Sequence, residues 1–223
     1  MSDSNELISV IMPCFNVEHT IKWTVDSVLN QTYSNIELIC VDDASTDNTR
    51  EVLEQLSMTD SRIRIISNSE NLGPGTSRNK AIDIAKGEYI SFIDGDDFYE
   101  VDFLELLYQD ITLTGSDISQ CQIRYIYNNN NYLVGSPVGT ISGIHCSYRI
   151  DINDGLPYLN PQLWNKLYKS SLFSGLSIKA ITYEDACIMI ELANRCNKFS
   201  VINDTHYNYN KRYSVLTGNV KGI

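Results

Sequence analysis

Short apolar runs alternate with amphipathic segments through the first hundred residues, and this alternation restricts the fold more than any other feature. The runs cover residues 7–12, 36–41, 63–66 and 89–93, and each has the length and composition of a strand. Between the first two runs, Ile21, Val25, Val28 and Leu29 recur at helical spacing. Apolar strands separated by helices indicate a parallel sheet covered by helices, with right-handed crossovers.

The next two connections also carry helix signals. One opens with Asp47 and Asn48, which are good N-cap residues. The other opens with Pro74, which suits a first helical turn, and Gly87 is placed as the C′ residue that follows its last turn. Strand and helix are therefore expected to alternate throughout this half.

The pattern changes after Asp97. We predict a helix over 102–114, a strand over 118–127, a polar turn at 128–131, a helix over 183–195, a strand over 199–202 and a tyrosine-rich tail over 206–213. This second half is expected to be mixed and partly antiparallel.

Length and charge limit the classes of function. A chain of 223 residues can bury one sizeable core, and we expect a single domain. With 28 acidic and 17 basic side chains the net charge is −11, so the chain repels phosphate backbones and we expect no nucleic-acid partner. A metal ion and nearby basic residues can still reverse the potential inside one cleft.

The cysteines and the N-terminus indicate a cytoplasmic protein. The six cysteines lack any C-x-x-C spacing and are interpreted as reduced core thiols. Residues 1–6 are polar and acidic, unlike a signal peptide, and no run of about 18 apolar residues exists that could span a membrane. Peripheral contact with the inner face of a membrane is compatible with this reading.

Carboxylates follow the strands at the edge where an open α/β sheet binds ligands. Asp42 and Asp43 follow the second run, and Asp94, Asp96 and Asp97 follow the fourth. Clustered acids repel one another unless a cation compensates, and Mg²⁺ or Mn²⁺ prefers two carboxylates together with substrate phosphate oxygens. Each piece taken alone has a structural reading, since Asp-Asp pairs cap helices and Asp-Gly marks turns. Their joint placement favours a metal-assisted diphosphate site.

These motifs resemble those of the family 2 glycosyltransferases, which have the GT-A fold. The resemblance is carried by the segments at 9–16 (SVIMPCFN), 41–47 (VDDASTD), 71–73 (NLG), 77–79 (SRN) and 87–97 (GEYISFIDGDD), and later by 164–168 (WNKLY) and 183–185 (YED). It covers almost all of the first hundred residues, whereas 115–160 matches nothing recognisable. The implied fold is Rossmann-like α/β, with a nucleotide-sugar half at 1–114 and an acceptor half at 115–223.

The resemblance implies a role for each matching residue. Asp185 is the expected catalytic base. The metal, Mn²⁺ or Mg²⁺, is expected on Asp94 and Asp96, with His206 as a third ligand of the kind that some GT-A enzymes supply. The nucleotide is expected to contact Pro13, Phe15, Asn16, Asp42, Asp43, Arg78, Asp94 and Gly95. The donor or acceptor sugar is expected at Asp97, Trp164, Lys166 and Glu184. Packing is an alternative for Trp164 and His206, and helix-dipole stabilisation is one for Asp185.

The implied activity is that of an inverting, metal-dependent hexosyltransferase. It would move a sugar from a nucleotide donor, with UDP-sugar expected, to a hydroxyl of a glycan or lipid-linked acceptor in bacterial cell-surface polysaccharide synthesis. One alternative is a flavodoxin-like Mg²⁺-binding signalling module, which accounts for Asp42 and Asp43 but not for residues 94–97. Another is a GT-A binding protein without activity.

Overall fold

The computed structural model describes residues 6–127, 131–135, 146–149 and 159–210. Within these ranges the strands form one mixed sheet in the order β3 (Ile63–Ser67), β2 (Ile36–Asp42), β1 (Ile8–Cys14), β4 (Tyr89–Phe92), β9 (Lys166–Lys169), β6 (Ile118–Tyr127), β10 (Lys198–Asn210) and β5 (Phe98–Tyr99). Two further strands lie off this path, β7 (Asn131–Gly135) beside β6 and β8 (Cys146–Arg149) beside β10. The predicted turn at 128–130 and the end of the predicted tail at 211–213 lie outside the described residues.

The first half is the parallel sheet that the apolar runs predict. β1 pairs in parallel with both β2 and β4, and β2 pairs in parallel with β3. Every residue of β2 is buried, as expected for a strand covered on both faces. Because the order is β3-β2-β1-β4, the chain reverses direction across the sheet between β3 and β4.

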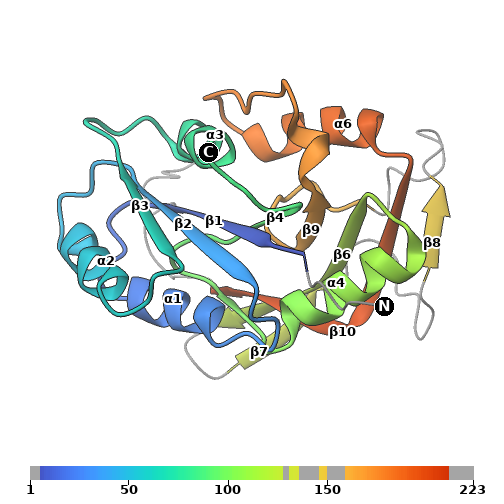
Figure 1. The fold of residues 1–223 in the computed structure, drawn as a ribbon, viewed down its shortest axis with the longest axis horizontal. Coiled ribbons are helices and arrows are strands. Elements are labelled where there is room, and N and C mark those ends of the chain that lie inside the picture. The colour runs from blue at the N-terminus through green and yellow to red at the C-terminus, as the bar shows by residue number, and fades with distance from the viewer. Residues whose placement is uncertain (1–5, 128–130, 136–145, 150–158, 211–223) are drawn as a thin grey trace, which may run out of the picture.

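The helices cover both faces of the sheet. α1 (Ile21–Leu29) and α2 (Thr49–Ser57) lie on one side with α4 (Phe103–Thr114), while α3 (Pro74–Ile82) and α6 (Glu184–Arg195) lie on the other, as Figure 1 shows. Right-handed crossovers produce this arrangement. The connections through α1 and α2 advance across the sheet from β1 to β3, whereas the connection through α3 returns from β3 to β4 on the other side of β1, so its helix lies on the opposite face.

The prediction for Gly87 is wrong. α3 ends at Ile82 with Asp83 as its C-cap, so Gly87 is not the C′ residue. A Cβ at position 87 would lie 2.6 Å from the Ser9 backbone nitrogen, and the Gly87 N–H donates to Ser9 Oγ at 2.8 Å. Glycine is therefore required where the chain enters β4 close to β1.

The second half contains strands that the sequence patterns did not predict. β9 pairs antiparallel with both β4 and β6, and so joins the two halves of the sheet. The segment at 206–210 is not a separate tail, because it continues the strand that starts at Lys198, with a register shift between Val201 and His206. β10 runs parallel to β6 and antiparallel to the short strand β5.

The cysteine prediction holds for part of the set. Cys14, Cys40, Cys121 and Cys196 are free and buried, whereas Cys187 is free and exposed on α6. The side chain of Cys146 lies outside the described part of the chain. The prediction of a core thiol is therefore wrong for Cys187.

Candidate functional site

A cleft opens at the carboxyl ends of β1, β2 and β4. Its volume is about 410 Å³, and it lies between the loops that follow these strands and the first turn of α6. Its lining residues are Pro13, Cys14, Phe15, Asn16, Val17, Asp43, Asn71, Pro74, Arg78, Asp94, Gly95, Asp96, Glu184 and Asp185. Ten of the residues predicted from the sequence are among them, namely Pro13, Phe15, Asn16, Asp43, Arg78, Asp94, Gly95, Asp96, Glu184 and Asp185.

Asp43 is held rigidly at one end of the cleft. Its carboxylate accepts the Leu72 N–H at 2.9 Å, the Gly73 N–H at 2.8 Å and the Asn68 amide at 2.6 Å. Gly73 has a φ of +82° and is the N-cap of α3, so a β-carbon at this position would be strained. The Asn71-Leu72-Gly73 motif thus orients Asp43.

Hydrogen bonds join the loop after β1 to the loop after β2. Asn16 and Ala44 both adopt the left-handed conformation, with φ of 52° and 58°. The Asn16 N–H donates to Ser45 Oγ at 3.1 Å, and Asn16 Oδ1 accepts the Thr46 N–H at 2.8 Å. Non-glycine residues rarely adopt this conformation without tertiary support, and strain of this kind concentrates at functional sites.

Phe15 and Asp42 differ in their access to the cleft. Phe15 lines it and is 45% exposed, so one face of its ring is available to a ligand. Asp42 is buried, accepts the Ser45 N–H at 3.2 Å and does not line the cleft. Its contacts support the loop rather than reach a ligand.

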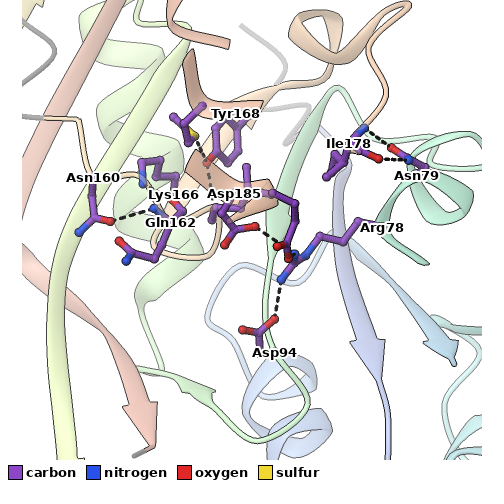
Figure 2. A network of polar contacts seen from close by, with 12 residues as sticks. Arg78, Asn79, Asp94, Asn160, Gln162, Lys166, Tyr168, Ile178 and Asp185 are labelled. Atoms are coloured by element: carbon purple, nitrogen blue, oxygen red, sulfur yellow. Dashed lines mark hydrogen bonds and ion pairs between the residues drawn. The ribbon is translucent and has the colours of Figure 1, made fainter. Parts of the chain in front are cut away.

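Arg78, one of the lining residues, is the centre of a polar network (Figure 2). Its guanidinium is only 3% exposed and reaches three carboxylates, with Nη2 at 2.8 Å from Asp94 Oδ1 and Nη1 at 3.0 Å from Asp185 Oδ1 and 3.2 Å from Glu184 Oε1. Burial lowers the pKa of Arg78, but the three carboxylates outweigh it and the net shift is upward. A single positive charge therefore joins α3, the loop after β4 and α6.

The turn at Asp94-Gly95-Asp96-Asp97 is held by hydrogen bonds from Thr20 and Thr24 and by the burial of Asp97. The Gly95 carbonyl accepts the hydroxyls of Thr20 at 3.0 Å and Thr24 at 3.1 Å. Asp97 is 1% exposed and does not line the cleft, and burial beside Asp94 and Asp96 raises its pKa well above the ordinary value. Asp97 therefore belongs to the support of the turn.

Asp185 lies opposite this turn, in the first turn of α6. The helix starts after Tyr183, whose φ of 63° is also left-handed. Burial, together with Asp94 and Glu184, raises the pKa of Asp185, while Arg78 and the Leu163 N–H hold it down. The net shift is upward, so this carboxylate binds a proton more readily than an ordinary aspartate does.

Besides Asp42 and Asp97, three further predicted site residues lie outside the cleft, namely Trp164, Lys166 and His206. Trp164 is 5% exposed and stacks on Tyr207 with ring centroids 4.3 Å apart. Lys166 is fully buried, and its ammonium donates to the Gln162 carbonyl at 2.6 Å and to Asn165 Oδ1 at 2.7 Å. Burial lowers the pKa of Lys166 to about 7.

His206 lies beside Arg124 and not beside the acidic turn expected to bind a metal. Its Nδ1 lies 3.3 Å from Arg124 Nη2, and burial and the Arg124 charge lower its pKa. It does not line the cleft. Among the described residues, no group of three or more His, Cys, Asp or Glu side chains is placed to hold a metal ion.

Tyr207 is a site-supporting residue that the sequence patterns did not identify. Its hydroxyl donates to Asp97 Oδ2 at 2.6 Å and accepts the Asp94 N–H at 3.2 Å. No local signal distinguishes it from the other tyrosines at 209 and 213, because its role depends on the position of β10 beside the turn.

Comparison with known proteins identifies the family. The family model described as glycosyl transferase family 2 matches residues 9–181, which is most of the chain. The chain belongs to glycosyl transferase family 2. The flavodoxin-like alternative is therefore excluded, and the parallel α/β fold with a mixed second half is the GT-A fold of this family.

Individual relatives agree with this assignment. The UDP-Glc:alpha-D-GlcNAc-diphosphoundecaprenol beta-1,3-glucosyltransferase WfgD of Escherichia coli is 42% identical over 129 residues, covering 58% of this chain and 49% of the relative. S. aureus TarS 1-349 in complex with UDP-GlcNAc superposes with a TM-score of 0.81 at 23% identity, covering 96% of this chain and 61% of TarS.

A mannosyltransferase shares the fold as well. PcManGT of Pyrobaculum calidifontis, solved with GDP-Man and Mn²⁺, has a TM-score of 0.68 at 18% identity and covers 91% of this chain and 56% of its own. The chain spans less than half the length of the first curated relatives it matches. No helix in the described ranges is long and apolar enough to cross a membrane.

Proposed function

We propose that this family 2 domain transfers a hexose from a UDP-sugar to a hydroxyl of a glycan or lipid-linked acceptor, with inversion at the anomeric carbon. The observation that carries the proposal is the placement of Asp94 and Asp185 on one buried guanidinium, at 2.8 and 3.0 Å, across a single cleft. One carboxylate belongs to the diphosphate side and the other faces it from α6.

The nucleotide end of the cleft suits uridine. The half-exposed ring of Phe15 offers a stacking face, and the Asp43 carboxylate is oriented by two backbone N–H groups. A carboxylate so held can accept a hydrogen bond from a base N–H. WfgD, a sequence relative at 42% identity, is named for a UDP-Glc donor, and TarS was solved with UDP-GlcNAc, which together support a UDP-sugar for this chain.

Asp94 and Asp96 fit a divalent ion, Mn²⁺ or Mg²⁺. Both line the cleft, and two carboxylates with substrate phosphate oxygens satisfy such an ion without a full protein cage. When bound, the ion would act as a Lewis acid that neutralises the charge of the departing diphosphate. PcManGT was solved with Mn²⁺, which supports the same use of the fold here.

Asp185 would act as the general base. It would accept the proton of the acceptor hydroxyl as the new C–O bond forms and the bond to the diphosphate oxygen breaks. Displacement from the face opposite the leaving group inverts the anomeric carbon, and no covalent intermediate is required. Glu184, which also lines the cleft, would lie on the sugar side.

The acceptor is expected to be lipid-linked or part of a bacterial cell-surface polysaccharide. WfgD is named for an acceptor linked to diphosphoundecaprenol, which supports a lipid-linked acceptor for this chain. We therefore place the protein in the cytoplasm, including the inner face of the membrane.

The proposed function is tested by measuring turnover of sugar nucleotides. A panel of UDP-, GDP- and dTDP-sugars is incubated with the protein and Mn²⁺, and release of the nucleoside diphosphate is measured with and without lipid-linked and oligosaccharide acceptors. Release of UDP from a UDP-hexose, stimulated by an acceptor, is expected. Binding of UDP-sugars without release under any acceptor would instead favour the inactive binding protein.

A further inference from the structure

Tyr207 occupies a fixed position between the two halves of the sheet. It lies on β10, pairs with Tyr99 of β5 on one side and with Ile123 of β6 on the other, and is fully buried. Its ring stacks on Trp164 at a centroid distance of 4.3 Å and meets Tyr99 edge-on at 5.8 Å. Backbone pairing and ring packing together leave its hydroxyl one direction in which to point.

That hydroxyl is bonded to both ends of the acidic turn. It donates to Asp97 Oδ2 at 2.6 Å and accepts the Asp94 N–H at 3.2 Å. The other Asp97 oxygen accepts the Asn210 N–H from the same strand at 2.8 Å. On the opposite side, Thr24 of α1 donates to the Gly95 carbonyl at 3.1 Å. The turn is thus held between α1 and β10.

We propose that Tyr207 is a positioning residue that sets the separation of the Asp94 and Asp96 carboxylates, and hence the affinity of the site for a divalent cation. The proposal rests on the proposed function, since it assumes that these two carboxylates bind the ion. Its physical basis is that a two-carboxylate site has few ligands to adjust, so an error in their spacing is not compensated by other protein groups. Hydrogen-bonded partners behind metal ligands commonly change metal affinity by about 10- to 100-fold when removed.

The distinguishing variant is Tyr207→Phe, which keeps the ring and its stacking on Trp164 but loses both hydrogen bonds. Tyr125→Phe is the matched control, because Tyr125 lies on the neighbouring strand β6, packs edge-on against Tyr209 at 5.7 Å and does not line the cleft. Binding of UDP is measured by calorimetry, first with a chelator and then in a titration with Mn²⁺ at saturating UDP.

In the presence of the chelator, we expect the affinity of Tyr207→Phe for UDP to lie within about twofold of the wild-type affinity. In the Mn²⁺ titration, we expect the variant to need an about tenfold higher Mn²⁺ concentration to reach half of its maximal binding signal. Tyr125→Phe should match the wild type in both measurements. An Mn²⁺ midpoint for Tyr207→Phe within twofold of the wild type, in a wild type that does respond to Mn²⁺, would overturn this inference alone. A wild type without any Mn²⁺ response would overturn the proposed metal site and this inference together.

If Tyr207→Phe does not yield folded protein, Asp97→Asn replaces it. An amide offers one acceptor oxygen in place of two, so the Tyr207 O–H and the Asn210 N–H can no longer each donate to an oxygen of their own on residue 97. The same loss of Mn²⁺ affinity with retained UDP binding is expected, and an unchanged Mn²⁺ midpoint in folded Asp97→Asn would overturn the inference.

Discussion

Arg78 and Asp185 form a 3.0 Å ion pair although 107 positions separate them in the chain. The same guanidinium binds Asp94 at 2.8 Å, so the proposed base and the proposed diphosphate side share one buried positive charge. Any change in one carboxylate is therefore transmitted electrostatically to the other. Substitutions at the individual carboxylates and at Arg78 are expected to separate these linked roles.

Asp185→Asn is expected to lower kcat by about 10²- to 10⁴-fold, because the amide keeps the size of the side chain but cannot accept a proton. UDP binding should be retained, since Asp43, Asp94 and Asp96 are unchanged. Glu184→Gln is the matched control and should be milder. The measurement is transfer to the true acceptor at saturating donor, and near-normal transfer by Asp185→Asn would move the assignment to Glu184.

Arg78→Met is expected to shift the acid limb of the pH–rate profile to higher pH. Burial already raises the pKa of Asp185 above its ordinary value, and the Arg78 charge opposes that rise. Since the base must be ionised, activity falls as the pH drops through this pKa, and removal of Arg78 raises the pKa further. The measurement is kcat/KM for the acceptor as a function of pH.

A control for this shift is Arg50→Met, which removes an exposed arginine of α2 that pairs with Glu54. Its profile should coincide with that of the wild type. An acid limb that stays in place in active Arg78→Met would mean that Asp185 is not the group that titrates.

Asp43→Ala and Asp96→Ala are expected to differ in how UDP stabilises the protein. A ligand that binds only the folded state raises the melting temperature by mass action. In Asp96→Ala, UDP should still raise the melting temperature in the presence of a chelator, but Mn²⁺ should add nothing to that rise. In Asp43→Ala, UDP should not raise the melting temperature with or without Mn²⁺.

The exposed Asp83 provides the control, and Asp83→Ala should behave like the wild type. Asp43→Ala should also lower the unliganded stability by about 1–3 kcal/mol, because three donors lose their acceptor. If UDP raised the melting temperature of the wild type equally with and without Mn²⁺, the result would argue against Asp96 as a metal ligand.

Lys166→Met is expected to change the pH dependence of stability. The pKa of Lys166 is lowered by burial to about 7 from its ordinary 10.5, so between these values the unfolded chain binds more protons than the folded one. Stability of the wild type relative to the variant should therefore rise with pH from about 7, by up to about 1.4 kcal/mol per pH unit.

The measurement is urea unfolding of both proteins at pH 7 and pH 8.5. Lys169→Met is the control, because Lys169 lies on the same strand but is partly exposed and pairs with Asp117. A constant difference between wild type and Lys166→Met over this range would show that the Lys166 ammonium is not destabilised by burial.

Local sequence patterns were sufficient to predict the parallel half of the fold and ten of the residues that line the cleft. Apolar runs buried on both faces and the helices between them are local patterns, and the structure has β1 to β4 and α1 to α3 where these patterns lie. The carboxyl ends of parallel strands meet at one edge of the sheet, so the sequence alone predicts that the side chains after each strand lie together.

Which of the later residues reach that edge depends on long-range packing. β9 is short and carries Lys166, whose charge suggests exposure, yet pairing with β4 and β6 buries it completely. On β10, His206 and Tyr207 are neighbours whose side chains point to opposite faces of the sheet. The position of β10 beside the acidic turn directs Tyr207 to Asp97 and leaves His206 with Arg124. Contacts between positions about a hundred residues apart leave no periodic signal in the chain, and they are settled only when the whole sheet is assembled.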